Sequence, residues 1–138
     1  MTTNAANLDW KTTRLTGVTG NPVSVNWTPF NFANFNYSGL CKVLIYFDVV
    51  GIANVEPTPR YVSQYCAIIP YEFDPSNNTG LVLTAGIAVI TSTPGDSMVW
   101  SFGHTSGPPA GMVATLSGVA SNTWTMFAGA RIRAAVVK

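Results

Sequence analysis

Side chains that could carry out acid–base or metal chemistry are few in this chain of 138 residues. It has six Asp or Glu side chains and one histidine, His104. A Ser–His–Asp arrangement could be assembled from Asp96, His104 and a serine, but nothing near them resembles a nucleophile elbow. A metal site built from His and Cys would need more ligands than Cys41, Cys66 and His104 supply. We therefore expect no catalytic residue, no metal and no cofactor, and hence no enzyme.

The carboxylates and the histidine have simpler interpretations. Glycosidase chemistry needs two carboxylates across a cleft, and the only glutamates, Glu56 and Glu72, both lie in proline-containing loops. Glu72 and Asp74 would point the same way on an extended segment and could bind calcium, although a solvated loop tip is the favoured interpretation. His104 follows Gly103 in a Gly-His-Thr-Ser-Gly-Pro-Pro turn, which favours a solvated loop histidine. A small hydrolase that uses His104 stays open as a third hypothesis.

Binding chemistry is better supplied, by an aromatic segment interleaved with asparagines. The aromatic residues of this segment are Trp27, Phe30, Phe32, Phe35 and Tyr37. Such rings could cap the open end of the fold, form a subunit interface, or stack on sugars beside the asparagine amides. Base stacking would want flanking basic residues, and none lies between Arg14 and Lys42. We take the five aromatics as candidate partner contacts and expect no nucleic acid.

Two arginines on the last alternating run are further candidate contacts. Arg131 and Arg133 lie two apart, so an extended chain would place both on one outer face. There they could hold an acidic partner. As charges on an edge strand they could equally serve only to discourage aggregation.

The amino-acid composition limits the classes of protein and of partner that the chain could represent. Charged residues are 9 % of the chain, against roughly 25 % in an ordinary soluble domain, and the net charge is +1. This balance disfavours a basic nucleic-acid binder and a polybasic membrane-surface protein. The longest apolar stretch, residues 81–90, is about half of the roughly 20 residues that a membrane-spanning helix needs, so we expect no membrane. Residues 1–9 lack the features of a secretory signal, which favours buried free thiols over a disulfide for Cys41 and Cys66.

Alternation of apolar and polar residues predicts an all-β fold. The alternating runs cover residues 18–27, 40–49, 60–70, 81–91, 97–103, 111–119 and 123–137. Pro22 inside the first run indicates an edge strand or a bulge. Seven or eight strands joined by short turns favour an antiparallel β-sandwich, with a jelly roll as the best single choice. We expect an N-terminal arm over residues 1–16 and one domain over residues 17–138.

Low charge, abundant Gly, Thr and Asn, and short strands give the chain a resemblance to the cement or decoration proteins of tailed bacteriophages. That resemblance implies a jelly-roll or sandwich subunit on the virion surface, made in the host cytoplasm, that binds the major capsid protein and stiffens its lattice. It also implies a homotrimer. Residues 122–129 resemble the final strand of trimeric jelly rolls of the complement and tumour-necrosis-factor type, which again hints at a trimer.

A second hypothesis comes from a different class. The aromatic segment from Trp27 to Tyr37 could make the chain a carbohydrate-binding module, or the receptor-binding tip of a virion spike. The capsid protein is the main expectation and the carbohydrate-binding module is the alternative.

Overall fold

A computed structural model describes residues 10–31, 40–53, 62–93, 96–107 and 110–137, with main chain only for residues 31 and 134–137. These residues form seven strands and one short 3-10 turn at Thr84–Gly86, with no α-helix among them. The strands are β1 (Lys11–Asn31), β2 (Cys41–Ala53), β3 (Val62–Asp74), β4 (Thr79–Val82), β5 (Ala88–Thr93), β6 (Ser97–Thr105) and β7 (Gly111–Val137). Within the described ranges there is no helix long and apolar enough to cross a membrane.

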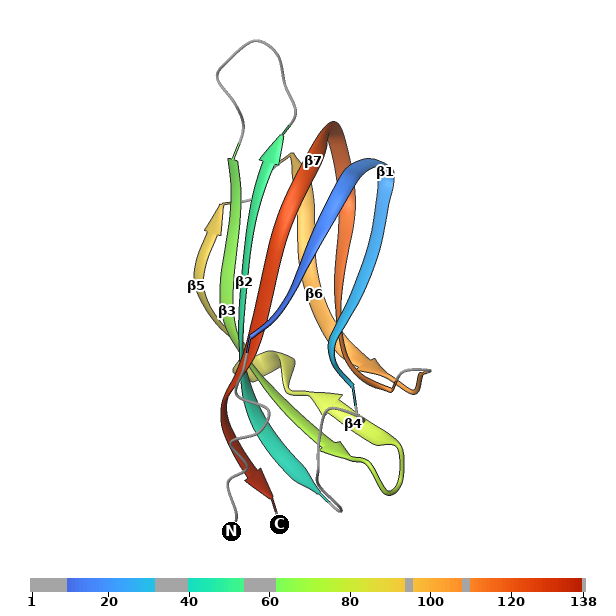
Figure 1. Ribbon diagram of the computed structural model, residues 1–138, viewed down its shortest axis with the longest axis vertical. Coiled ribbons are helices and arrows are strands. Elements are labelled where there is room, and N and C mark those ends of the chain that lie inside the picture. Colours follow the sequence, from blue (N-terminus) through green and yellow to red (C-terminus); the bar gives the residue numbers. More distant parts are fainter. Residues whose placement is uncertain (1–9, 32–39, 54–61, 94–95, 108–109, 138) are drawn as a thin grey trace.

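All seven strands belong to one antiparallel sheet that folds over on itself. The order is β1-β7-β2-β3-β4, while β5 also pairs with β3 and β6 also pairs with β7. The two longest strands, β1 and β7, both arch over at the same end of the molecule (Figure 1). The last part of β7 therefore lies between β2 and the first part of β1, whereas the first part of β7 lies between β6 and the last part of β1.

The bend creates two layers that share a core. The first layer contains β3, β2, the C-terminal half of β7 and the start of β1, and the second contains β6 and the remaining halves of β7 and β1. Phe47 of β2 links them, because its ring centroid lies 4.9 Å from that of Phe102 and 5.2 Å from that of Trp100, both on β6. Trp27 of β1 lies 6.1 Å from the same ring. Aromatic burial between the layers thus stabilises the bend.

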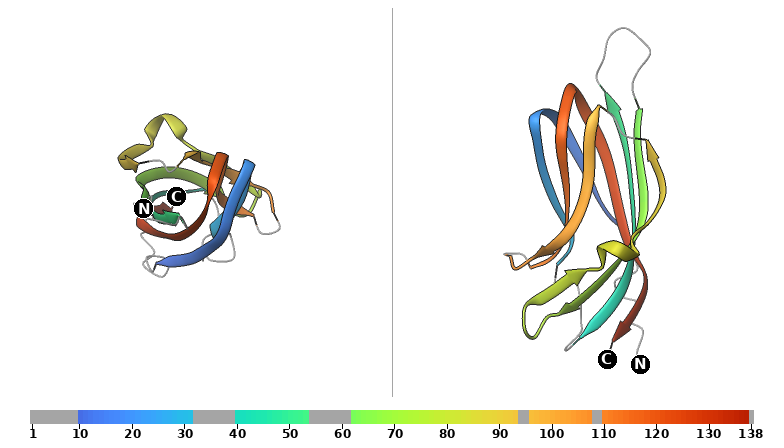
Figure 2. Two further views of the ribbon diagram at one scale, coloured as in Figure 1. Left: turned by 90° about the horizontal axis from the view of Figure 1, so that it is seen from above. Right: turned by 180° about the vertical axis from the view of Figure 1, so that it is seen from behind.

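The sheet is not closed. β5 and β6 follow each other in the chain, but no ladder joins them in the part that the structure describes. The view from behind shows the arches of β1 and β7 at one end of the molecule and β5 and β6 apart from each other (Figure 2). The expectation of an all-β antiparallel fold is confirmed, whereas a jelly roll is not.

Two of the expected strand boundaries are wrong. Residues 111–119 and 123–137 form the single strand β7, which bends without breaking. Residues 81–91 are instead divided by the 3-10 turn, and Pro70 of β3 gives the physical reason. The carbonyl of Pro70 accepts from the backbone N–H of Leu83 at 3.0 Å, but Pro70 has no N–H to return the bond. The ladder is therefore interrupted at Pro70, with β4 pairing on one side of it and β5 on the other.

The N-terminal part of the chain also differs from its prediction. The first strand was expected over residues 18–27, but β1 begins at Lys11, and Lys11–Leu15 pair with Met126–Ala130 of β7. The division into an arm over residues 1–16 and a domain over residues 17–138 stays a prediction. Residues 1–9 lie outside the described part. The irregularity predicted at Pro22 is confirmed, because the β1–β7 register shifts between Gly20 and Val23. Cys41 and Cys66 are both buried and are not joined in a disulfide, as expected.

Candidate functional site

The register of the first layer builds a site on its outer face, which is the face turned away from the core. Gly129 of β7 is paired with Thr12 of β1 on one side and with Asp48 of β2 on the other. Two residues further along β7, Phe127 is paired with Arg14 and with Val50. Side chains two apart on a strand share a face, so these two rows lie next to each other on the outer face.

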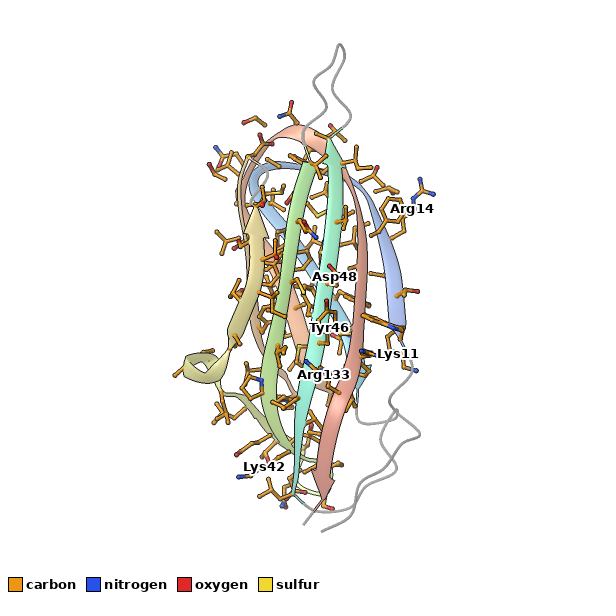
Figure 3. All side chains as sticks on the ribbon, turned by 90° about the vertical axis from the view of Figure 1, so that its left-hand side faces the viewer. Lys11, Arg14, Lys42, Tyr46, Asp48 and Arg133 are labelled. Carbon is orange, nitrogen blue, oxygen red and sulfur yellow. The ribbon has the colours of Figure 1, made fainter. Side chains whose placement is uncertain are left out.

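A third row completes the arrangement on the other side of Gly129. Arg131 of β7 is paired with Tyr46 of β2, and Trp10 immediately precedes β1. A row of small or short side chains, Thr12, Gly129 and Asp48, therefore lies between two rows of large ones. Figure 3 looks onto this face and shows Tyr46 and Asp48 following each other along β2.

Trp10 forms one wall of the site and is held in place on three sides. Its ring packs edge-on against Tyr46 at 5.6 Å between centroids, and the Arg131 guanidinium lies 5.2 Å from the Trp10 centroid. The ring also lies against the backbone of Gly129, where an added Cβ would come within 3.1 Å of it. Trp10 nevertheless remains 46 % exposed, so a preorganised aromatic surface is left to solvent.

The opposite wall repeats this pairing of a cation with an aromatic ring. The guanidinium of Arg14 lies 5.6 Å from the ring centroid of Phe127, whose side chain is 50 % exposed. Between the walls is a shallow groove of about 590 Å³, which we call the Trp10–Phe127 groove. It is lined by Trp10, Thr12, Thr13, Arg14, Asp48, Val50, Phe127, Ala128 and Gly129.

Asp48 supplies the carboxylate of the groove. Its Oδ1 atom is buried and has no hydrogen-bond partner among the residues that the structure places. The neighbouring Tyr46 hydroxyl accepts a hydrogen bond from the Cys66 thiol at 3.0 Å. That hydrogen bond, together with burial and the charge of Asp48, raises the pKa of Tyr46. The phenol therefore stays protonated at neutral pH, and the groove keeps one carboxylate with unused acceptor capacity.

A second hollow lies between the layers on their open side. This inter-layer cleft of about 320 Å³ has an apolar floor that includes Met98, Leu116 and Met126, and Ser63, Ser92 and Ser97 also line it. The carboxylate of Asp96 lines it as well but is already used. It accepts from the Asn122 backbone N–H, from the Asn122 side-chain amide and from the Trp124 indole N–H, at 3.0, 3.0 and 2.9 Å. The cleft therefore offers mostly neutral groups to a ligand.

The aromatic residues predicted as partner contacts do not form a surface cluster in the part that can be described. Phe30 is fully buried in the core. Trp27 is half-buried against Phe47. Phe32, Phe35 and Tyr37 lie outside the described residues.

The two predicted arginines do share the outer face. Arg131 and Arg133 are both exposed on β7, and Arg131 borders the Trp10–Phe127 groove through its contact with Trp10. Arg133 lies on the same face nearer the end of the sheet, beyond Tyr46 in the direction of Lys42 (Figure 3). A contact role for either arginine stays a prediction.

His104 is not the solvated loop residue that its sequence context indicates. It lies on β6, and its Nδ1 atom shares a 2.7 Å hydrogen bond with the hydroxyl of Tyr71 on β3. Gly80 of β4 leaves the space for this pair, since an added Cβ would collide with the His104 ring. Burial lowers the pKa of His104 and raises that of Tyr71, so both are neutral at pH 7. The described ranges contain no group of three His, Cys, Asp or Glu residues that could hold a metal.

Comparison with known proteins adds a likeness of fold to solved structures. No family model and no curated protein matches this sequence. The fold is similar to part of the tailspike protein of Acinetobacter phage vB_ApiP_P1, with a TM-score of 0.46 and 12 % sequence identity. The match covers 90 % of this chain but only 22 % of the tailspike chain.

The main residues of the groove were missed at the level of sequence. Trp10, Asp48 and Phe127 lie on three different strands or their ends, and no local motif connects them. Two signals pointed toward them. Trp10 is an isolated large aromatic ahead of the first strand, and Asp48 is the one acidic residue in the run 40–49.

Proposed function

We propose that this chain is a glycan-binding domain and that the Trp10–Phe127 groove holds the sugar chain. One observation carries the proposal: a half-exposed Trp10 ring, held by its ring contacts, lines an open groove together with Asp48, whose buried Oδ1 atom has no hydrogen-bond partner among the described residues. An aromatic face stacks against the C–H groups of a sugar ring, and a carboxylate accepts from its hydroxyls.

Binding without cleavage fits the carboxylate content of the groove. Hydrolysis of a glycosidic bond uses two carboxylates facing each other, one as the acid and one as the base or nucleophile. Asp48 is the single carboxylate among the described residues that line the groove. We therefore propose a binding protein and not an enzyme.

The proposal also includes a location. We keep the receptor-binding part of a virion spike, which is the alternative raised from the sequence, as the setting in which such a domain would act. A cement role on a capsid lattice, with the major capsid protein as partner, stays a prediction of the sequence. A homotrimeric assembly likewise stays a prediction of the sequence. The open side of the sheet and the exposed β5 strand leave room for neighbouring copies.

The test is affinity electrophoresis in gels containing dextran, galactomannan, polygalacturonate, colominic acid or chondroitin sulfate. We expect at least one polysaccharide to retard the wild-type protein. Trp10→Ala should weaken that binding about tenfold, which corresponds to about 1.4 kcal/mol. Leu81→Ala removes an apolar side chain on β4 that is more exposed than Trp10 and lies outside the groove, and it should leave binding unchanged.

A third variant separates the groove from the aromatic segment. Trp27→Ala should retain binding, because Trp27 packs against the core rather than lining the groove. Thermal midpoints measured for all variants identify any loss of binding that reflects unfolding. If a folded Trp27→Ala protein loses binding while Trp10→Ala keeps it, the groove is the wrong site. If no polysaccharide retards the wild type, the proposed function is wrong.

A further inference from the structure

The charges around the Trp10–Phe127 groove are unbalanced. Arg14 lines the groove and Arg131 borders it through its contact with Trp10, while Asp48 is the acidic group between them. Within the residues that the structure describes, the salt bridge at 3.1 Å is between Lys42 and Glu72, and neither Arg14 nor Arg131 takes part in one. Among the described residues, therefore, no salt bridge neutralises either of the two guanidinium groups that flank the groove.

Both guanidiniums are held in place by rings instead of by acids. Arg14 lies over Phe127, and Arg131 lies over Trp10 and, at 5.9 Å, over Tyr46. Stacking on an aromatic face occupies the plane of a guanidinium but leaves the N–H groups at its edge free to donate. Those N–H groups form the planar fork that matches a carboxylate, and this side of each arginine is available to a ligand.

We propose that the ligand is an acidic polysaccharide, whose anionic groups pair with Arg14 and Arg131 while the hydroxyls between them donate to Asp48. This inference rests on the proposed function and specifies the class of glycan. Arg131 lies four residues beyond Phe127, the partner of Arg14, along β7, which is a distance of about 14 Å along an extended strand. One sugar ring is too small to span that distance. The two arginines therefore contact different sugars of one chain.

Charge alternates along the groove, and this alternation gives selectivity. A polymer with anionic groups at the two arginines and a neutral stretch at Asp48 matches it, whereas a uniformly dense polyanion meets the carboxylate of Asp48. Nucleic acid is such a polyanion, and its binding sites usually need more cations than the two found here. A single-stranded oligonucleotide is accordingly a control probe.

The experiment compares chemically matched polymers with the full-length protein. Polygalacturonate and colominic acid are each tested beside their carboxyl-reduced forms, which keep the sugar backbone and lose the charge. Dextran, chondroitin sulfate and a dT20 oligonucleotide complete the set, the sulfated polymer distinguishing sulfate from carboxylate as the anion. The variants are Arg14→Gln, Arg131→Gln and Arg133→Gln, the last of which removes an exposed cation of the same strand from outside the groove.

We expect a carboxylated or sulfated polymer to bind and the carboxyl-reduced polymers to bind at least tenfold more weakly. Arg14→Gln and Arg131→Gln should each weaken binding about fivefold, since exposed ion pairs contribute little individually. The affinity of the double variant for the polymer should be about 25-fold lower, because the two arginines are far enough apart to act independently. Raising NaCl should weaken the wild type more than the double variant, whereas Arg133→Gln should behave like the wild type.

The possible failures are distinct. Equal binding of a polymer and its carboxyl-reduced form, or binding to dextran alone, would overturn the acidic ligand but leave the glycan-binding function standing. An equal loss in Arg133→Gln, or equal affinity for the oligonucleotide, would show diffuse attraction of polyanions and would also overturn it. Failure to bind any of the polysaccharides would overturn the proposed function itself.

Discussion

Replacing Asp96 tests how the open side of the molecule is fixed to the bend of β7. Asp96 lies between β5 and β6, while its three hydrogen-bond donors belong to Asn122 and Trp124 in the bend. Among the described residues, Trp124 has the largest fully buried side chain, and its indole N–H donates a hydrogen bond to the Asp96 carboxylate. Asp96 also has a φ of +52°, a conformation that Asp and Asn tolerate better than other side chains.

Asp96→Ala should lower the free energy of unfolding by about 3 kcal/mol. Leaving the buried Trp124 N–H without an acceptor costs about 2 kcal/mol, and alanine at positive φ adds about 1 kcal/mol. The Asn122 donors contribute little because water can replace the carboxylate there. In a chain of this length the change corresponds to a thermal midpoint about 10 °C lower. Urea unfolding followed by tryptophan fluorescence measures it.

Matched substitutions divide this cost into its parts. Asp96→Gly removes the strain at positive φ but not the lost acceptor, so it should cost about 2 kcal/mol. Asp96→Asn retains an acceptor oxygen and the backbone preference, and should cost about 1 kcal/mol. Asp74 accepts from Ser76 and Asn77 of its own exposed turn, and Asp74→Ala should cost less than about 1 kcal/mol.

The effect of Asp96 should also depend on pH. Burial alone would raise the pKa of Asp96, but the hydrogen bonds from Trp124 and Asn122 outweigh it and lower the pKa below the ordinary value. The stabilisation is therefore fully present above the ordinary pKa of about 3.9 and is lost as pH falls through the folded-state pKa. The stability difference between wild type and Asp96→Ala should shrink below pH 4. A difference under about 0.5 kcal/mol at pH 7 would refute the role of Asp96.

Two further predictions concern buried contacts between layers and strands. Because burial lowers the pKa of His104, NMR titration of the untagged chain, which has one histidine, should give a pKa below about 6.5. The free energy of unfolding should fall as the pH drops from about 6.5, the ordinary pKa, toward the lower folded-state pKa. A measured pKa at or above about 6.5 would contradict this. At Gly118, φ is +103° and an added Cβ would collide with the Ser97 carbonyl, so Gly118→Ala should cost about 3 kcal/mol in urea unfolding. Gly103→Ala, whose Cβ would meet nothing within 4 Å, should cost under about 1 kcal/mol, and equal losses would show that the Gly118 argument is wrong.

The strands were predictable from sequence where one face is buried and the other is not. In β2 the residues from Cys41 to Val49 alternate between buried and more exposed positions, and the run 40–49 was found for that reason. The break within residues 81–91 was not visible, because its cause is the missing N–H of Pro70 on a neighbouring strand. The continuity of β7 was hidden for a related reason. Its bend is stabilised by Asp96, which is 26 residues from Asn122 in the chain.

The site was less predictable than the fold because it depends on register across strands. The cluster of aromatic residues from Trp27 to Tyr37 was the strongest local signal for a binding site in the sequence. A cluster of hydrophobic residues is equally typical of a segment that fills the core, as Phe30 does. His104 was misjudged in the same way, since a glycine- and proline-rich context hid its partner Tyr71 on another strand. Arg131 was recognised correctly as an outer-face residue because strand periodicity alone decides which face it occupies.

The bend of the sheet explains why the groove lies on the outer face of the first layer. Folding β1 and β7 over β2 commits the inner faces to the shared core, where Phe47 contacts rings of the second layer. The outer face of the first layer is then free to vary without loss of core packing. On that face a groove requires only a row of short side chains between two rows of large ones, and Gly129 supplies the lowest point of that row. An added Cβ at Gly129 would lie 3.1 Å from the Trp10 ring and would require the ring to shift by a few tenths of an ångström, so the same glycine contributes to the floor of the groove and to the position of its wall.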